Sequence, residues 1–248
     1  MPRARSFSTT SSFYGYLPPG VKWLLIANTA VFLICYLGGR PLQDHVAVLL
    51  ALSAEAAVRT FMIWQVFTYM FVHFGLMHLL FNMLALWMFG TPLEQTWGTR
   101  RFLKYYFLCG IAAGACDTAV NELLGHHLTS TIGASGAIYG LLLAFGVCYP
   151  DQIVLMNFLF PIKAKYLVMI YGAVALLSAL GSGNSRISNV AHLGGMLFGY
   201  LYLRVPLPTR FLRLPDVGGW YRQWRMQRAK KRFQVYMRKH GGRGPWVN

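Results

Sequence analysis

The residues of this chain that could do chemistry are a serine, a few histidines and an asparagine. A serine hydroxyl becomes nucleophilic when an adjacent base accepts its proton, and neutral imidazole is the usual base near pH 7. Ser135 lies in a run of small residues, 133–136, and His192 lies near the start of a later apolar stretch. His78 and Asn82 are four residues apart, so on a helix they share one face, from which both can donate hydrogen bonds to an oxyanion. The set predicts acyl transfer by nucleophilic catalysis.

A carboxylate, the third member of many serine hydrolase sites, is missing from this set. The chain has only seven acids and none stands beside His192 in the sequence: Asp44, Glu55, Glu94, Asp117, Glu122, Asp151 and Asp216. We therefore expect a Ser–His dyad in which packing and hydrogen bonds orient the imidazole.

Each fragment of the set also has a purely structural interpretation. Gly133-Ala134-Ser135-Gly136 is typical of close helix packing in a chain with 25 glycines. His192 alone is equally well explained as an interhelical hydrogen-bonding residue. The catalytic hypothesis therefore depends on whether the chain brings these residues to the same place.

The composition predicts that membrane helices carry the candidate residues. Hydrophobic residues make up 56% of the 248 residues and charged residues only 12%, whereas soluble domains carry about 25% charged residues. The stretch 46–58 is apolar but short and contains Glu55, which indicates an interfacial or re-entrant loop between the first two spans. Since about 20 apolar residues cross the hydrocarbon layer, we expect an all-α integral membrane protein with six spans, at residues 21–38, 68–90, 101–121, 135–149, 166–182 and 188–206.

The expected domain organisation is a six-helix domain at 21–206 between polar tails at 1–20 and 207–248. Short loops rich in Lys and Arg stay on the cytoplasmic side of a membrane. If the N-terminus is cytoplasmic, all but three of the 23 basic residues fall inside, the exceptions being Arg40, Arg59 and Arg186. Both termini are therefore expected in the cytoplasm.

This topology puts the candidate residues at one depth. Spans two, four and six run from outside to inside, and the candidates lie in their outer halves: His73, His78, Asn82, Ser135 and His192. The span that Ser135 opens is only about 22 Å long, short of the roughly 30 Å layer. We expect Ser135 below the outer boundary in a water-accessible pocket, where ionisable residues usually mark function.

The net charge of +16 is concentrated in the tail after the last span. Aromatic residues interleaved with its Lys and Arg suit the surface of an anionic inner leaflet. A cytoplasmic tail that only sets topology is favoured over a dedicated partner site. Nucleic-acid binding is not expected, because no recognised reader module accompanies the charge. No metal or organic cofactor is expected either, and four cysteines without metal or disulfide spacing are expected to be buried packing residues: Cys35, Cys109, Cys116 and Cys148.

Three motifs together resemble the rhomboid intramembrane serine proteases. They are His73-x4-His78-x3-Asn82, then Gly133-Ala134-Ser135-Gly136 with Tyr139-Gly140, and finally Ala191-His192-x-Gly194-Gly195-x3-Gly199. The ordered set is highly specific although each fragment is weak, and the resemblance covers about residues 20–206.

The resemblance implies a role for each matching residue. Ser135 would be the nucleophile and His192 the general base and then the general acid. His78, Asn82 and the Ser135 amide would form the oxyanion hole, Tyr139 would pack against His192, and His73 and Gly133 would support the site. Gly195 and Gly199 form a GxxxG pair that we expect to bring the sixth span close to the fourth.

Trp64-Gln65 departs from the family pattern, since many rhomboids have Trp-Arg in the first outer loop. This puts the packing of that loop in question, not the dyad. Glu94 lies in an inner turn, Glu94-x2-Trp97-Gly98, that resembles the family's, and we expect its role to be structural.

The leading hypothesis is a serine endopeptidase that cleaves single-span membrane proteins near the outer boundary, through an acyl-enzyme. The alternative is a catalytically silent rhomboid-like protein that binds membrane clients for quality control. A transporter is disfavoured because it predicts an internal repeat of spans, and none is found. The expected location is a cell membrane, of the bacterial cytoplasmic type. Substrate identity, oligomeric state and the gating element are not fixed by the sequence.

Overall fold

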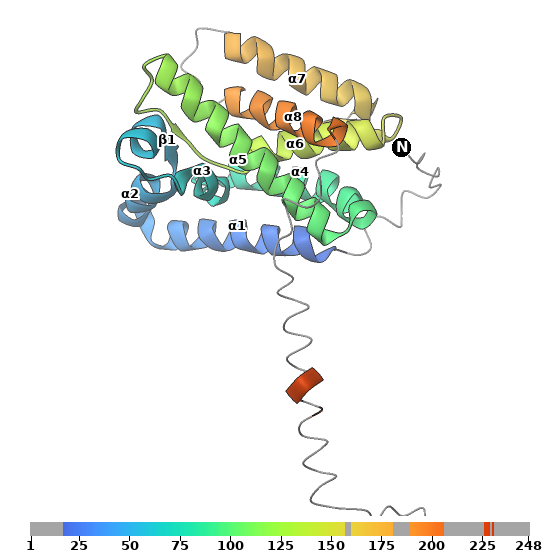
Figure 1. Ribbon diagram of the computed structural model, residues 1–248, viewed down its shortest axis with the longest axis horizontal. Helices are drawn as coiled ribbons and strands as arrows, with labels where there is room; N and C mark the ends of the chain where they lie inside the picture. Colours follow the sequence, from blue (N-terminus) through green and yellow to red (C-terminus); the bar gives the residue numbers. More distant parts are fainter. Residues whose placement is uncertain (1–16, 157–159, 181–188, 206–225, 229, 231–248) are drawn as a thin grey trace, which may run out of the picture. The chain divides into compact units, whose positions relative to one another are not determined.

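The computed structural model describes residues 17–156, 160–180, 189–205, 226–228 and 230 (Figure 1). The chain divides into two units, residues 1–206 and 207–248, and the elements below all lie in the first. Most of the polar tails expected at 1–20 and 207–248 lies outside the described residues, as does Arg186.

Six of the described helices make up most of the first unit, and three of them form its centre. α5 (Thr99–Leu123), α6 (Ser135–Cys148) and α8 (Asn189–Arg204) pack against one another. α4 (Leu76–Trp97) lies against α6 and α5, α1 (Pro19–Leu37) lies against α4, and α7 (Ala164–Leu180) covers α8 and α6. In Figure 1, α1 and α7 form opposite edges of this unit.

Five of the six expected apolar segments are helices whose ends lie within two residues of the prediction. These are the segments expected at 21–38, 101–121, 135–149, 166–182 and 188–206, which form α1, α5, α6, α7 and α8. The mostly helical architecture therefore agrees with the predicted fold class.

The segment expected at 68–90 begins later than predicted. Residues up to 71 form α3 (Gln65–Thr68) and the 3₁₀ turn η2 (Tyr69–Phe71), and the backbone is extended at Val72 and again at Gly75 before α4 starts. Glycine costs about 1 kcal/mol relative to alanine inside a helix, which favours a break here. The prediction that His73 lies within this span is therefore wrong, because His73 precedes the helix.

The loop between α1 and α4 contains, before α3 and η2, a further helix, a strand and a π-turn. α2 (Gly39–Leu50) has no buried residue, and it is followed by β1 (Leu52–Ser53) and η1 (Glu55–Arg59). β1 pairs antiparallel with β2 (Ser130–Thr131), which ends just before the loop that carries Ser135. The interfacial segment predicted at 46–58 is thus attached directly to the chain leading into the candidate site.

A β-hairpin that was not predicted from the sequence joins α6 to α7. β3 (Ile153–Met156) pairs antiparallel with β4 (Phe160–Lys163). Asp151, just before β3, accepts hydrogen bonds from Lys165 Nζ at 2.9 Å and Lys163 Nζ at 3.3 Å. These exposed ion pairs tie the end of α6 to the start of α7.

Gln65 fixes the loop at the point where the chain departs from the family pattern. Its buried side chain donates to the carbonyl oxygen of Val48 at 2.9 Å and accepts from the Ser53 amide at 3.2 Å. The neighbouring Trp64 Nε1 donates to the carbonyl oxygen of Leu49 at 2.8 Å. The Trp64-Gln65 pair therefore satisfies backbone groups of the loop itself.

Glu94, in the last turn of α4, anchors the start of α1. The first amides of a helix have no partner within it, and Pro18 provides no side-chain cap. The carboxylate of Glu94 accepts hydrogen bonds from the amides of Gly20 and Val21, both at 2.7 Å, and from Thr99 Oγ1 at 2.6 Å. The structural role expected for Glu94 is thus a helix cap supplied by another helix.

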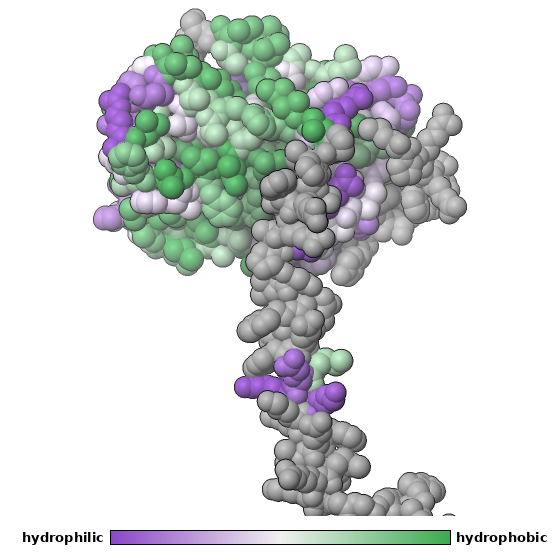
Figure 2. Space-filling view, viewed as in Figure 1, coloured by the Kyte–Doolittle hydropathy of each residue, from purple (hydrophilic) through white to green (hydrophobic). Residues whose placement is uncertain are grey.

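The surface of this unit is as apolar as the composition suggests. Hydrophobic residues cover much of the face seen in Figure 2, and α1 and α7 each expose large apolar side chains. Among the described helices, Pro19–Leu37 and Leu76–Trp97 are both long and apolar enough to cross a membrane, while α6 and α7 are apolar but shorter. These features are those of a membrane protein, and the count of six crossings stays a prediction.

Candidate active site

Ser135 and His192 lie within hydrogen-bonding distance at the centre of the unit. Ser135 opens α6, and His192 lies in the first turn of α8. The distance from Ser135 Oγ to His192 Nε2 is 2.8 Å. Since His192 is only 5% exposed, the imidazole contacts the serine in a largely desolvated position. The structure therefore brings together the two residues that are 57 positions apart in the chain.

The ring of Tyr139 lies flat against the His192 imidazole and restrains its orientation. The two rings stack at a centroid distance of 4.1 Å with an interplanar angle of 2°. His192 Nδ1 is buried and has no hydrogen-bond partner in the part of the chain that the structure describes. Ring stacking, with the bond to Ser135, is thus the contact that orients this imidazole, where a catalytic triad uses a carboxylate.

The loop before Ser135 is shaped by Gly133, whose φ of +102° favours glycine. Its amide donates to the carbonyl oxygen of Tyr69 at 2.9 Å. A methyl group added at Gly133 would lie 2.6 Å from His78 Nε2, so a side chain here would displace that imidazole. Gly133 therefore serves two purposes, a backbone turn and a close approach to His78.

His73 supports this loop from the segment before α4. It is fully buried, and its Nε2 accepts a hydrogen bond from the Ala134 amide at 3.4 Å. Its ring lies 4.9 Å from that of His78, centroid to centroid. The structure thus places His73 beside the turn that presents Ser135, although outside the helix in which it was expected.

His78 and Asn82 lie one turn apart on α4, as their spacing predicted. Asn82 Nδ2 donates to the carbonyl oxygen of His78 at 2.8 Å, and an amide nitrogen carries a second N–H that can serve another acceptor. Asn82 lines the same groove as Ser135. His78 approaches the site through Gly133 instead, as its short distance to that residue indicates.

Glycines allow α8 to touch α6. A methyl group added at Gly195 would overlap the carbonyl of Gly136, and one at Gly140 would lie 3.1 Å from the carbonyl oxygen of Gly195. Gly199 differs from the prediction, because it faces the Tyr105 hydroxyl and the Cys109 thiol of α5. Of the predicted GxxxG pair, Gly195 therefore meets α6 and Gly199 meets α5. Both contacts arise because α8 packs against these two helices.

An open groove of about 620 Å³ reaches the nucleophile from between α4, α6 and α7. Apolar side chains line most of it, and polar groups come from Ser135, Asn82, Tyr139 and Tyr171. Val154 and Leu155 of β3 extend its lining to the hairpin. Such a groove suits an apolar polypeptide segment whose backbone meets Ser135 at one position.

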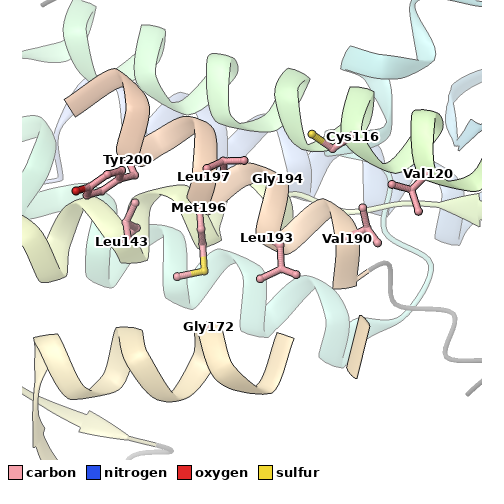
Figure 3. Close-up of a pocket in the computed structure, with 10 residues that line it drawn as sticks. All are labelled: Cys116, Val120, Leu143, Gly172, Val190, Leu193, Gly194, Met196, Leu197 and Tyr200. Carbon is pink, nitrogen blue, oxygen red and sulfur yellow. The ribbon is translucent and has the colours of Figure 1, made fainter. Parts of the chain in front are cut away.

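A second hollow, of about 540 Å³, lies between α8 and its neighbours. Figure 3 shows its lining residues, which come from α5, α6, α7 and α8 and include Cys116, Gly172 and Met196. It contains neither Ser135 nor His192. The expectation that all cysteines are buried is wrong for Cys116 and Cys148, which are half-buried. Cys116 borders this hollow, and Cys148 is the last residue of α6.

The sequence reasoning missed Asp117 as a residue that holds the candidate site. Its buried carboxylate accepts a hydrogen bond from Thr131 Oγ1 at 2.7 Å, two residues before Gly133. An acid inside an apolar segment is costly without hydrogen-bond partners. This cost could have indicated from the sequence that Asp117 has a structural or functional partner. Asp117 thus joins α5 to the strand that leads into the Ser135 turn.

Comparison with known proteins agrees with the family resemblance of the motifs. Residues 60–208 match the model of the rhomboid domain, which is more than half of the chain. The chain therefore belongs to the rhomboid family, a class of multi-helix membrane proteins.

Named relatives come from bacteria and eukaryotes. YdcA of Bacillus subtilis is 37% identical over 139 residues, 56% of this chain and 64% of that protein. Rhomboid protease GluP of Bacillus subtilis is 29% identical over 202 residues, 81% of this chain and 36% of that protein. Rhomboid protease GlpG of Pectobacterium atrosepticum is 25% identical over 178 residues, 72% of this chain and 59% of that protein. The chain thus spans less than two thirds of the length of each of these relatives.

Proposed function

We propose that this chain is an intramembrane serine endopeptidase with six membrane crossings and both termini in the cytoplasm. Its family membership supports the proposal, and relatives such as GluP and GlpG are named as rhomboid proteases. The single observation that carries it is the 2.8 Å distance between Ser135 Oγ and His192 Nε2. A bacterial cytoplasmic membrane, with the basic tail against its anionic inner leaflet, is the proposed setting.

The first half-reaction forms an ester on Ser135. Oγ attacks the carbonyl carbon of the scissile peptide bond while its proton passes to His192 Nε2, and the carbonyl electrons move onto oxygen. When this tetrahedral intermediate collapses, the C–N bond breaks and Nε2 gives the proton to the leaving amine. The N-terminal part of the substrate remains as the acyl-enzyme.

The second half-reaction uses water in place of the amine. His192 Nε2 accepts a proton from the attacking water and later returns it to Ser135 Oγ as the ester bond breaks. Stacking on Tyr139 keeps the imidazole in place through both proton transfers. The products are a carboxylic acid and the free serine.

The oxyanion in both halves is assigned to three donors. The Ser135 amide is at the positive end of α6, the free N–H of Asn82 lines the groove, and His78 completes the set. Fixed donors aimed at a developing charge are worth about 10²- to 10³-fold in rate each. Stacking on Tyr139 orients the His192 ring as a triad's carboxylate would, but it does not balance the charge of the imidazolium, so a slow protease is expected.

The proposed substrate is a membrane protein with a single span. Its segment must enter the apolar groove between α4 and α7 and present an extended peptide bond to Ser135. A helical peptide bond is shielded from attack, so small or helix-breaking residues near the outer boundary would favour cleavage.

The test is cleavage of a model single-span substrate in proteoliposomes. Ser135→Ala should reduce cleavage to the uncatalysed background, and His192→Ala should reduce kcat by about 10³-fold or more. Ser178→Ala, an exposed serine of α7, and His45→Ala, an exposed histidine of α2, are the matched controls and should retain full activity.

Cleavage that survives both site variants would remove the dyad. A folded wild-type protein that binds the substrate but neither cleaves it nor reacts at Ser135 with a fluorophosphonate would instead identify a client-binding rhomboid-like protein.

A further inference from the structure

Tyr171 of α7 lies in the groove beside the candidate site without belonging to the dyad or the oxyanion donors. It lines the groove together with Ser135 and Tyr139. Its ring meets the ring of Tyr139 nearly edge-on, at a centroid distance of 6.2 Å and an interplanar angle of 74°. Edge-to-face pairs in this range are attractive and directional. Tyr171 is therefore in contact with the residue that stacks on His192.

Contact with the Tyr139 ring is one of two contacts that restrain the orientation of the His192 imidazole. With no partner for Nδ1 among the described residues, rotation of the imidazole is restrained by the bond to Ser135 and by the flat contact with Tyr139. A tilt of the Tyr139 ring would therefore tilt the imidazole or open a gap behind it. Tyr171 is the aromatic neighbour of Tyr139 on the groove side.

Among the helices α1 and α4–α8, α7 has the fewest buried residues, so its few contacts near the site contribute more to its position. Only Ala164, Leu167 and Ala175 are buried along its length. On the side toward α8, Gly172 meets the flexible side chain of Met196, and an apolar hollow lies beside them (Figure 3). On the other side lies the groove itself. The Tyr171–Tyr139 contact thus connects a loosely packed helix to the base of the dyad.

We infer that Tyr171 is a positioning residue that holds Tyr139 flat against His192, and so couples the place of α7 to the orientation of the general base. The inference rests on the proposed function, because it assigns His192 as the base. It predicts that a substrate occupying the groove contacts the same ring that supports the base. Loss of the Tyr171 ring should then lower the reactivity of Ser135 even toward a reagent that does not fill the groove.

The experiment compares Tyr171→Leu with Tyr171→Phe in the full chain. Aromatic pairs of this kind correspond to about a threefold to tenfold effect. Tyr171→Leu should reduce the rate of Ser135 labelling by a small fluorophosphonate by that factor and lower kcat with little change in KM. Tyr171→Phe keeps the ring and should restore both rates. Tyr166→Leu, the same change at a half-exposed tyrosine outside the groove on the same helix, should have no effect.

A double-variant cycle tests the route through Tyr139. In a Tyr139→Leu background, adding Tyr171→Leu should cause no further loss, whereas additive losses would overturn the inference. A Tyr171→Leu variant that labels normally but has a raised KM would also overturn it, because Tyr171 would then be only a wall of the groove. Equal thermal unfolding of the variants excludes misfolding as the cause of a loss.

An NMR readout separates failure of this inference from failure of the proposed function. Stacking on Tyr139 should shift the ring-proton resonances of His192 upfield, and Tyr171→Leu should reduce that shift in histidine-labelled protein whether or not the protein cleaves. If the wild type shows the shift and Tyr171→Leu leaves it unchanged, the inference fails even when cleavage is real. If the shift falls as expected while the wild type neither cleaves nor labels, the proposed function fails and the coupling stands.

Discussion

The two sides of α6 are packed in opposite ways. Toward α8, Gly136 and Gly140 bring backbone against backbone, and there is no room for a methyl group at Gly195. Toward α4 and α7, the same helix lines an open groove of about 620 Å³. One face of α6 therefore fixes the distance between Ser135 and His192. The other face leaves room for the polypeptide substrate of the proposed reaction.

The largest effect is expected where the close packing is broken. Gly195→Ala should move α8 away from α6 and reduce kcat/KM for a model substrate by at least about 100-fold, since misplacement by about 1 Å can cost that much. The matched control is Gly172→Ala in α7, where an added methyl meets only the Met196 side chain at 3.3 Å. This control should stay within about twofold of wild type. Equal activities for the two variants would contradict the assigned role of the close face.

A smaller effect is expected when the open side is filled. Ala85 lines the groove, and Ala85→Phe should exclude a membrane substrate from it and lower cleavage by about 10- to 100-fold, a loss of about 1.4 to 2.7 kcal/mol. Labelling of Ser135 by a small fluorophosphonate should remain normal, because the dyad is untouched. Ala173→Phe, at an exposed position of α7, is the control and should preserve both activities. Parallel losses of cleavage and labelling in Ala85→Phe would show that groove and dyad are not separable.

The smallest effect is expected at the hairpin that borders the open side. Hydrogen bonds from Lys165 and then Lys163 hold the pKa of Asp151 below its ordinary value of 3.8. Because folding lowers this pKa, the ion pair stabilises the fold fully above pH 3.8. Its contribution is lost as the pH falls through the lower pKa of the folded state. Asp151→Asn should therefore lower Tm slightly at neutral pH, as is usual for exposed ion pairs, and the difference from wild type should shrink in strong acid. A difference that persists at low pH would mean that the ion pair is not its source.

The positions of α1 and α5–α8 were predictable because the length of an apolar stretch indicates a helix that can cross a membrane. The ends of α5 and α6 follow from charged residues and from the Gly133 turn, both visible in the sequence. The start of α4 was not predictable from hydropathy, because residues 68–75 are mostly apolar yet form short turns. These turns are bound to the preceding loop, for example by the hydrogen bond from Thr68 Oγ1 to the carbonyl oxygen of Leu50. The strand pairing of Leu52 with Thr131 joins segments too distant in sequence for any local pattern to indicate.

The candidate site was predictable where a residue type carries the signal. Ser135, His192, His78 and Asn82 are polar residues in apolar segments, and their cost in a membrane distinguishes them from their neighbours. Tyr171 carries no such signal, since one tyrosine among 14 in a chain rich in aromatic residues is unremarkable by composition. Its relation to the dyad follows only from ring geometry, which needs three helices in place at once.

The cap that Glu94 provides has a consequence for the order in which the protein is made. Glu94 lies 74 residues after Gly20, so α1 leaves the ribosome long before its partner exists. Until α4 is complete, the amides of Gly20 and Val21 must find water or lipid headgroups at the membrane surface. The first helix can thus enter the membrane early, but its depth and rotation become fixed only when the second long helix has been synthesised through residue 94.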